Sequence, residues 1–190
     1  MVSVSFSRSL AAAGLVVLLC SLVAPQARAN VFASKAEALR EAFPDADRVD
    51  EKSFVLTADQ AQSIETRAKA PLERRIWTLY SAYRGNELLG SAVIDVRNVR
   101  TLPEALLIVI APDGSVRSLR VLAFHEPSEY QPTERWLAQL DGKRLGPDLH
   151  LKRAIHAIAG ATLSSQAVTR SVRTALALYQ VLLGNDPAAE

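Results

Sequence analysis

The first 29 residues contain no Asp or Glu, and the whole sequence has only one cysteine, Cys20. This acid-free stretch carries an early positive charge at Arg8, an apolar run and a small-residue site at Ala27-Arg28-Ala29. Such a pattern is typical of a secretory signal peptide, which predicts that residues 1–29 are removed. The apolar run is shorter than the roughly 20 residues of a membrane span. An uncleaved N-terminal membrane anchor is the alternative.

Cleavage would leave a mature chain of residues 30–190, which is long enough for one domain with a real core. This chain would contain no cysteine, which excludes a disulfide framework and a cysteine-ligated metal or iron–sulfur site. The full sequence has 22 basic and 20 acidic residues, and Arg8 and Arg28 would leave with the signal. No charge excess would then remain to recruit nucleic acid.

The pattern of the mature chain predicts an α+β fold, with an antiparallel sheet of hairpins flanked by helices. Helices are expected over Ser34–Phe43, over Ala58–Ala68 behind the cap Thr57, around Trp136, and in a long amphipathic stretch that ends near Leu183. Strands are expected over Ser53–Leu56, Arg75–Arg84, Glu87–Val96, Leu106–Ile110 and Val116–Phe124, with Asn98–Thr101 as a continuation or a bulge.

A small-residue segment stands just before the last helix. It reads Gly160-Ala161-Thr162-Leu163-Ser164-Ser165, so backbone and hydroxyl groups could approach an anion closely. Read alone, the same residues are also ordinary helix caps and packing. Spacing by itself therefore leaves both interpretations open.

This segment resembles the Ser-Gly-Ala-Thr-x-Thr/Ser signature of an FMN-binding domain. The G subunit of the Rnf electron transport complex and the C subunit of the sodium-translocating NADH:quinone oxidoreductase share that domain. Upstream, the run from Val121 to Pro127, followed by Trp136 and Leu140-Asp141-Gly142, is similar to the family's acidic loop and its Trp-containing stretch. The resemblance covers roughly residues 75–183.

The resemblance implies that FMN is the cofactor and that Thr162 carries it as a phosphoester. A flavin transferase outside the cytoplasm would install the FMN, with FAD as donor. The hydroxyl is no nucleophile unaided, so the transferase must supply the activating chemistry. The family usually has Asp and Ser where this sequence has His156 and Ala159.

Several other side chains are candidates for the cofactor pocket. His125 and Glu126 lie in the segment that lines it in the family, although their surroundings also have the composition of a polar surface turn. Tyr130 and Trp136 are candidates for stacking on the flavin ring, whereas Trp77 is expected in the core. Together with the small-residue segment, the predicted cofactor-binding set is Gly160, Ala161, Thr162, Leu163, Ser164, Ser165, His125, Glu126, Tyr130 and Trp136.

The spacing of His125, His150 and His156 fits no metal-ligand pattern, and no acid–base or nucleophilic constellation indicates catalysis of its own. The sequence thus predicts a periplasmic or otherwise extracytoplasmic flavoprotein that relays electrons to an unidentified redox partner. The alternatives are an FMN-dependent reductase with its own substrate and a cofactor-free binding module of the same fold.

Overall fold

The computed structural model describes residues 30–31, 34–151, 153 and 155–184. The predicted signal peptide over residues 1–29 lies outside the described residues. The helices are α1 (Lys35–Ala42), α2 (Ala58–Ala68), α3 (Glu134–Leu137) and α4 (Thr162–Leu183), with short 3-10 turns η1 (Ser128–Tyr130) and η2 (Ala138–Leu140).

One antiparallel sheet of six strands, in the order β1-β6-β5-β4-β3-β2, forms the centre of the molecule. Its strands are β1 (Asn30–Val31), β2 (Arg48–Val55), β3 (Ile76–Arg84), β4 (Glu87–Asn98), β5 (Pro103–Ile110) and β6 (Val116–Phe124). Neighbours from β2 to β6 are consecutive in the chain: hairpins join β3 to β4, β4 to β5 and β5 to β6, whereas α2 lies between β2 and β3. The predicted α+β class is therefore confirmed.

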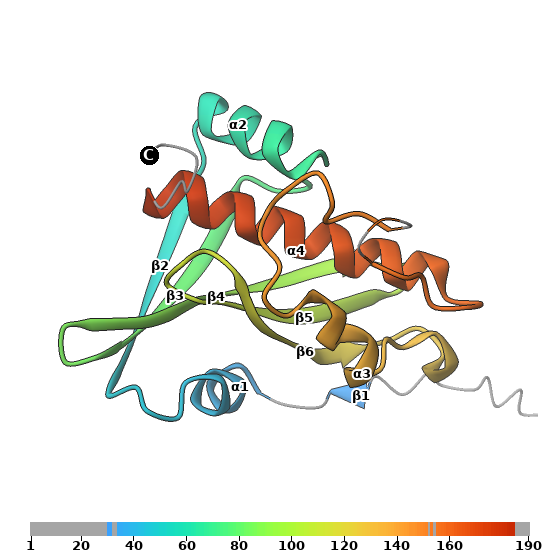
Figure 1. Ribbon diagram of the computed structural model, residues 1–190, viewed down its shortest axis with the longest axis horizontal. Coiled ribbons are helices and arrows are strands. Elements are labelled where there is room, and N and C mark those ends of the chain that lie inside the picture. Colours follow the sequence, from blue (N-terminus) through green and yellow to red (C-terminus); the bar gives the residue numbers. More distant parts are fainter. Residues whose placement is uncertain (1–29, 32–33, 152, 154, 185–190) are drawn as a thin grey trace, which may run out of the picture.

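The helices cover the two faces of this sheet unequally. In Figure 1, α4 crosses one face and α2 lies outside it, while α1 lies against the opposite face. The larger core cluster joins the sheet to α2, α3 and α4, and its fully buried members include Ile64, Ile108 and Tyr179. A smaller cluster joins Leu39 and Phe43 of the α1 region to the other face.

The two short helix starts were predicted from their caps, and both caps are present. The Ser34 hydroxyl accepts a hydrogen bond from the backbone NH of Glu37, at 3.2 Å. Thr57 and Gln60 form a reciprocal capping box at the start of α2. These bonds satisfy backbone NH groups that a helix leaves free, which is why both helices begin where the sequence indicates.

Two predicted elements have different limits in the structure. The strand expected at Ser53–Leu56 is longer, because β2 starts at Arg48. It is an edge strand, and most of its side chains are exposed. Because neither face is buried, the strand lacks the alternation of apolar and polar residues from which a strand is predicted. The strand expected over Glu87–Val96 continues through Asn98, which pairs with Pro103, whereas the residues from Val99 to Thr101 form a loop and no bulge.

No helix within the described ranges is both long enough and apolar enough to cross a membrane.

Candidate functional site

The small-residue segment ends at the first turn of α4, the longest helix of the described chain. Thr162 is the first residue of this helix and is exposed. Ala161 occupies the cap position and provides no side-chain cap. The first backbone NH groups of a helix have no acceptor inside it, so those of Thr162, Leu163 and Ser164 point out of the helix end. Such NH groups, together with the helix dipole, favour an anion.

The backbone before Thr162 leaves room for a ligand. Gly160 has a φ of 79°, in the left-handed region, and a Cβ added there would meet no atom within 4 Å. Glycine is thus required by conformation at this position and not by crowding. Ala161 is buried, while Ala159 and Gly160 are exposed. The open side of the segment therefore consists of Ala159, Gly160 and the Thr162 side chain.

The two serines of the segment differ from Thr162 in their surroundings. The helix begins at Thr162, so Ser164 and Ser165 lie in its first turn, and both are buried. The Ser165 hydroxyl accepts from the backbone NH of Ile158 at 2.9 Å and donates to the carbonyl of Ala161 at 3.1 Å. Ser165 therefore already closes the segment onto the helix. Leu163, in contrast, is 45% exposed beside Thr162.

Hydrogen bonds of His156, which precedes the small-residue segment, join this part of the chain to α3 and η2. The indole Nε1 of Trp136 donates to the carbonyl of His156 at 2.6 Å. The Gln139 side-chain oxygen accepts from the backbone NH of His156 at 3.1 Å and lies 3.2 Å from its Nδ1. His156, one of the two positions that depart from the family signature, thus anchors the segment through its backbone.

The stacking candidates are less accessible than the sequence suggested. Trp136 is only 8% exposed and belongs to the larger core cluster, and Tyr130 is partly buried against the same cluster. Trp77 is buried, as predicted, and its Nε1 donates to the carbonyl of Arg74 at 3.1 Å. The contacts of Trp136 position the segment before α4, whether or not its ring also touches a flavin.

Glu126 and His125 both face the loop between β4 and β5. One Glu126 oxygen accepts from the backbone NH groups of Arg100, Thr101 and Leu102, at 3.1, 2.7 and 2.8 Å. Burial opposes ionisation of this carboxyl, but these three NH groups together keep its pKa below the usual value. The His125 Nδ1 lies 3.0 Å from a backbone carbonyl at the start of β5. These contacts give Glu126 and His125 a structural task in holding the loop.

A buried charged cluster at the end of β4 and the start of β5 was not predicted. Asp95 accepts from Arg97 on one oxygen and pairs with Arg74, at 2.9 Å, on the other. Glu104, opposite Arg97 in the sheet, is 1% exposed and has no hydrogen-bond partner among the described residues. Burial raises its pKa to about 8, with Arg97 opposing the rise and Asp95 adding to it. The sequence does not indicate this cluster. Asp95 and Arg97 alternate with apolar residues, a pattern that is typical of a strand whose charged side chains face solvent.

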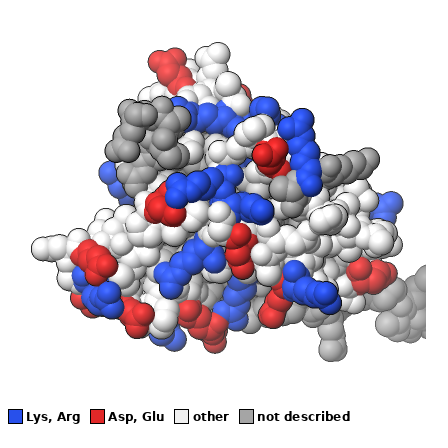
Figure 2. All heavy atoms as spheres, in the orientation of Figure 1, with Lys and Arg blue, Asp and Glu red and all other residues white. Residues whose placement is uncertain are grey.

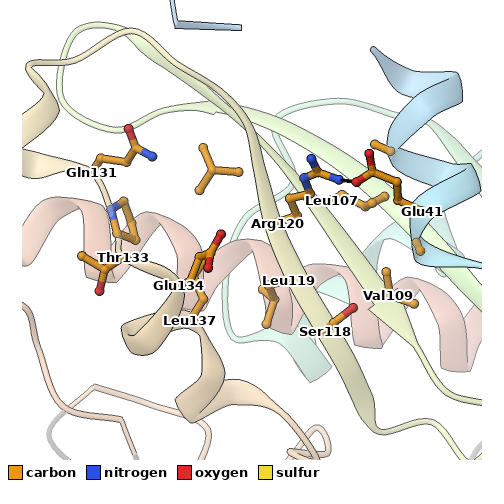
Figure 3. A pocket seen from close by; sticks show the side chains of 14 residues that line it. Glu41, Leu107, Val109, Ser118, Leu119, Arg120, Gln131, Thr133, Glu134 and Leu137 are labelled. Atoms are coloured by element: carbon orange, nitrogen blue, oxygen red, sulfur yellow. Dashed lines mark hydrogen bonds and ion pairs between the residues drawn. The ribbon is translucent and has the colours of Figure 1, made fainter. Parts of the chain in front are cut away.

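A cavity of about 890 Å³ lies beside α1, β5, β6 and α3. Figure 3 shows it between α1 and the segment from Gln131 to Leu137, with Leu107, Val109 and Leu119 among its labelled side chains. Arg120 of β6 forms an ion pair with Glu41 of α1 across it. None of residues 159–165 lines this cavity, so it is no part of the site around the Thr162 hydroxyl.

The three histidines do not gather. His125 and His156 have the separate partners described above, and the part of the chain that the structure describes contains no group of three His, Cys, Asp or Glu able to hold a metal. The Arg153 guanidinium, close to the small-residue segment in sequence, donates to the carbonyl of Pro147 at 2.9 Å.

The residues around Thr162 fit the phosphate end of FMN. An exposed hydroxyl lies at a helix start that lacks a side-chain cap, and the glycine before it leaves open space. When bound, FMN supplies the redox chemistry through its ring. The chain itself would offer the Thr162 hydroxyl and the NH groups of the first turn of α4, with support from Trp136 and Gln139.

Comparison with known proteins supports FMN as the cofactor. Residues 103–177 match the family model of the FMN-binding domain, a range that includes all the predicted cofactor-binding residues. No curated protein matches the sequence. Among solved structures, the chain is similar to NqrC of Shewanella oneidensis, with 14% sequence identity and a TM-score of 0.52, over 76% of this chain and 86% of that one. Residues 103–177 therefore form an FMN-binding domain with FMN as its cofactor, in a fold that resembles NqrC.

Proposed function

We propose that this chain is an exported flavoprotein that carries FMN as a phosphoester on Thr162 and relays electrons outside the cytoplasm. The observation that carries the proposal is the position of one hydroxyl. Thr162 is exposed at the first turn of the 22-residue helix α4, inside the range that matches the FMN-binding domain. Of the hydroxyls in the segment, Ser164 and Ser165 are buried, which leaves Thr162 for a transferase to reach.

A covalent link suits a protein that leaves the cytoplasm, because lost FMN could not be replaced there. The phosphate on Thr162 would be stabilised by the free NH groups and the dipole of α4. The acid-free start, apolar run and small-residue site of residues 1–29 support export, with an N-terminal membrane anchor as the alternative. The predicted partners are a flavin transferase and a redox protein, either membrane-bound as in the complexes of the resembling subunits or soluble.

Intact mass spectrometry tests the attachment. The chain is expressed together with a flavin transferase, and the wild type is compared with Thr162→Val and with the control Ser171→Ala, which removes a buried hydroxyl of the same helix outside the predicted cofactor-binding set. We expect the mass of FMN to be added to the wild type and to the control and to be missing from Thr162→Val. If Thr162→Val gains the same mass as the wild type, FMN is attached elsewhere and the assignment is overturned.

The electron-relay part of the proposal needs a separate measurement. The loaded protein should accept electrons from a chemical reductant and pass them to an artificial acceptor, while turning over no small substrate by itself. Rapid consumption of a dedicated substrate at the flavin would favour the FMN-dependent reductase instead.

A further inference from the structure

A second, smaller cavity lies beside α4, on the side where α2 ends. Its volume is about 240 Å³. It is lined by Lys69 after α2, by His150, and by Gln166, Arg170 and Arg173 of α4. None of the contacts assigned above to the predicted site residues uses this cavity. Figure 2 shows a band of Lys and Arg side chains across the upper part of the molecule, where Figure 1 places α2 and α4.

The cavity carries positive charge that no carboxylate neutralises. Arg173 is 3% exposed, and its guanidinium donates only to backbone carbonyls, those of Arg67, Ala68, Gly146 and Leu149, at 2.7 to 3.0 Å. Within the described ranges, Lys69, Arg170 and Arg173 have no ion pair. Burial lowers the pKa of His150, and the positive charges of Arg173, Lys69 and Arg153 lower it further. An electron-rich or anionic group would therefore be stabilised here.

The cavity lies on the same face of α4 as Thr162. Gln166 is four residues after Thr162, Arg170 eight and Arg173 eleven, which are spacings that keep side chains on one side of a helix. With the rise of a helix, Gln166 is about 6 Å and Arg170 about 12 Å along the axis from Thr162. Thr162, Gln166 and Arg170 are all exposed. An open track thus leads along the helix from the proposed attachment point to the cations.

We propose that this cavity receives the pyrimidine end of the flavin ring, with the ribityl chain lying along α4 over Gln166. The inference rests on the proposed attachment at Thr162. The pyrimidine part of the ring carries two carbonyl oxygens, which match the donors of Lys69, Arg170 and His150. The site fits one class of ligand, an electron-rich heterocycle tethered at the start of α4.

This placement has a consequence for the redox properties. Reduction of the flavin adds two electrons from the redox partner and one proton at the ring nitrogen N5. The reduced ring then carries one net negative charge on its pyrimidine part. Lys69 and Arg170 would stabilise that charge and so raise the midpoint potential of the flavin. Protein charges near this part of the ring are a general means of tuning its electronics.

The test measures the midpoint potential of the loaded protein by spectroelectrochemical titration. The variants are Arg170→Gln, on an exposed helix surface, and Lys69→Asn, where asparagine suits the left-handed backbone at a φ of 51°. The control is Arg117→Gln, which removes one positive charge over Phe43 on the opposite face of the sheet. Covalent loading is checked by intact mass and folding by circular dichroism.

We expect both cavity variants to shift the potential to more negative values, the double variant to shift it further, and the control to leave it unchanged. Fully loaded variants with the potential of the wild type would overturn the placement of the ring and leave the attachment at Thr162 standing. An equal shift in Arg117→Gln would overturn it as well, because distant charge alone would then explain the result. A wild type that carries no flavin would overturn both proposals.

Discussion

The indole NH of Trp136 donates to the backbone carbonyl of His156 over 2.6 Å, and this bond joins α3 to the stretch of chain that leads into the first turn of α4. The two residues are 20 positions apart, so the bond fixes the segment to a separate element of the fold. The donor is a buried indole and the acceptor belongs to a loop. The bond therefore fixes the backbone of this loop at His156, six positions before Thr162.

Replacement of Trp136 by Phe should loosen this segment selectively. The lost bond is worth about 0.5–1.5 kcal/mol, with a further loss from the smaller ring. We expect faster hydrogen exchange in peptides that cover residues 155–161, measured by mass spectrometry. Trp77→Phe is the matched control, since it also removes an indole donor to a backbone carbonyl, that of Arg74. Equal exchange of the segment in both variants would contradict the role of Trp136.

Glu126→Gln should lower stability at neutral pH by about 1–3 kcal/mol, because a charged acceptor of three backbone NH groups becomes neutral. The folded-state pKa of Glu126 is lowered, so its contribution is present above the unfolded value of 4.5 and is lost as the pH falls through the folded value. Urea unfolding should therefore show the two proteins converging below about pH 4.5. Glu129→Gln, in the exposed η1 turn, is the control and should leave stability at neutral pH unchanged.

Glu104 should give the opposite dependence on pH. Its pKa is raised to about 8 in the folded chain from 4.5, so between these values the unfolded chain has released a proton that the folded chain retains. Stability then falls as the pH rises through this range, by up to about 1.4 kcal/mol per pH unit. Glu104→Gln should remove this fall and stabilise the protein at pH 8 in urea titrations. Glu73→Gln, at an exposed position, should retain the fall of the wild type.

Gly90→Ala should be strongly destabilising. Gly90 has a φ of 152°, and a Cβ there would lie 2.7 Å from the carbonyl oxygen of Ile110 and 3.1 Å from the Phe43 ring. The oxygen belongs to the neighbouring strand β5, so the sheet itself would have to shift. We expect a loss of more than about 2 kcal/mol, seen as a lower Tm. Gly146→Ala is the control, because its nearest neighbour would be 3.9 Å away and its φ is ordinary; a similar loss there would argue against the steric cause.

Much of the fold could be predicted from local signals. Caps such as Thr57 and the apolar periodicity of α4 depend only on residues close in sequence, so they identify helices directly. The edge strand β2 was underestimated because exposed residues such as Glu51 and Lys52 show no alternation. Strand length there is decided by pairing with β3, a contact that no local pattern records.

The candidate site was predicted in part, for a similar reason. A local motif pointed to Thr162, and the family comparison agrees with the cofactor. The bonds of Glu126 to the 100–102 loop and the approach of Lys69 to Arg170 join distant parts of the chain. Only the spacing of Gln166, Arg170 and Arg173 after Thr162 could have indicated the cationic cavity from sequence. The contacts of the other predicted residues with FMN stay predictions.

The helix that offers Thr162 at its start is also the helix whose middle and end form the core, with Val168, Val172 and Tyr179 fully buried. A flavin tethered there would inherit the rigidity of the best-packed element, whereas a tether on a loop would let the ring sample many distances to a partner. Electrons would then enter and leave from a fixed point, so docking of the partner alone would set the transfer distance. Movement of the attachment point itself would require the first turn of α4 to unwind.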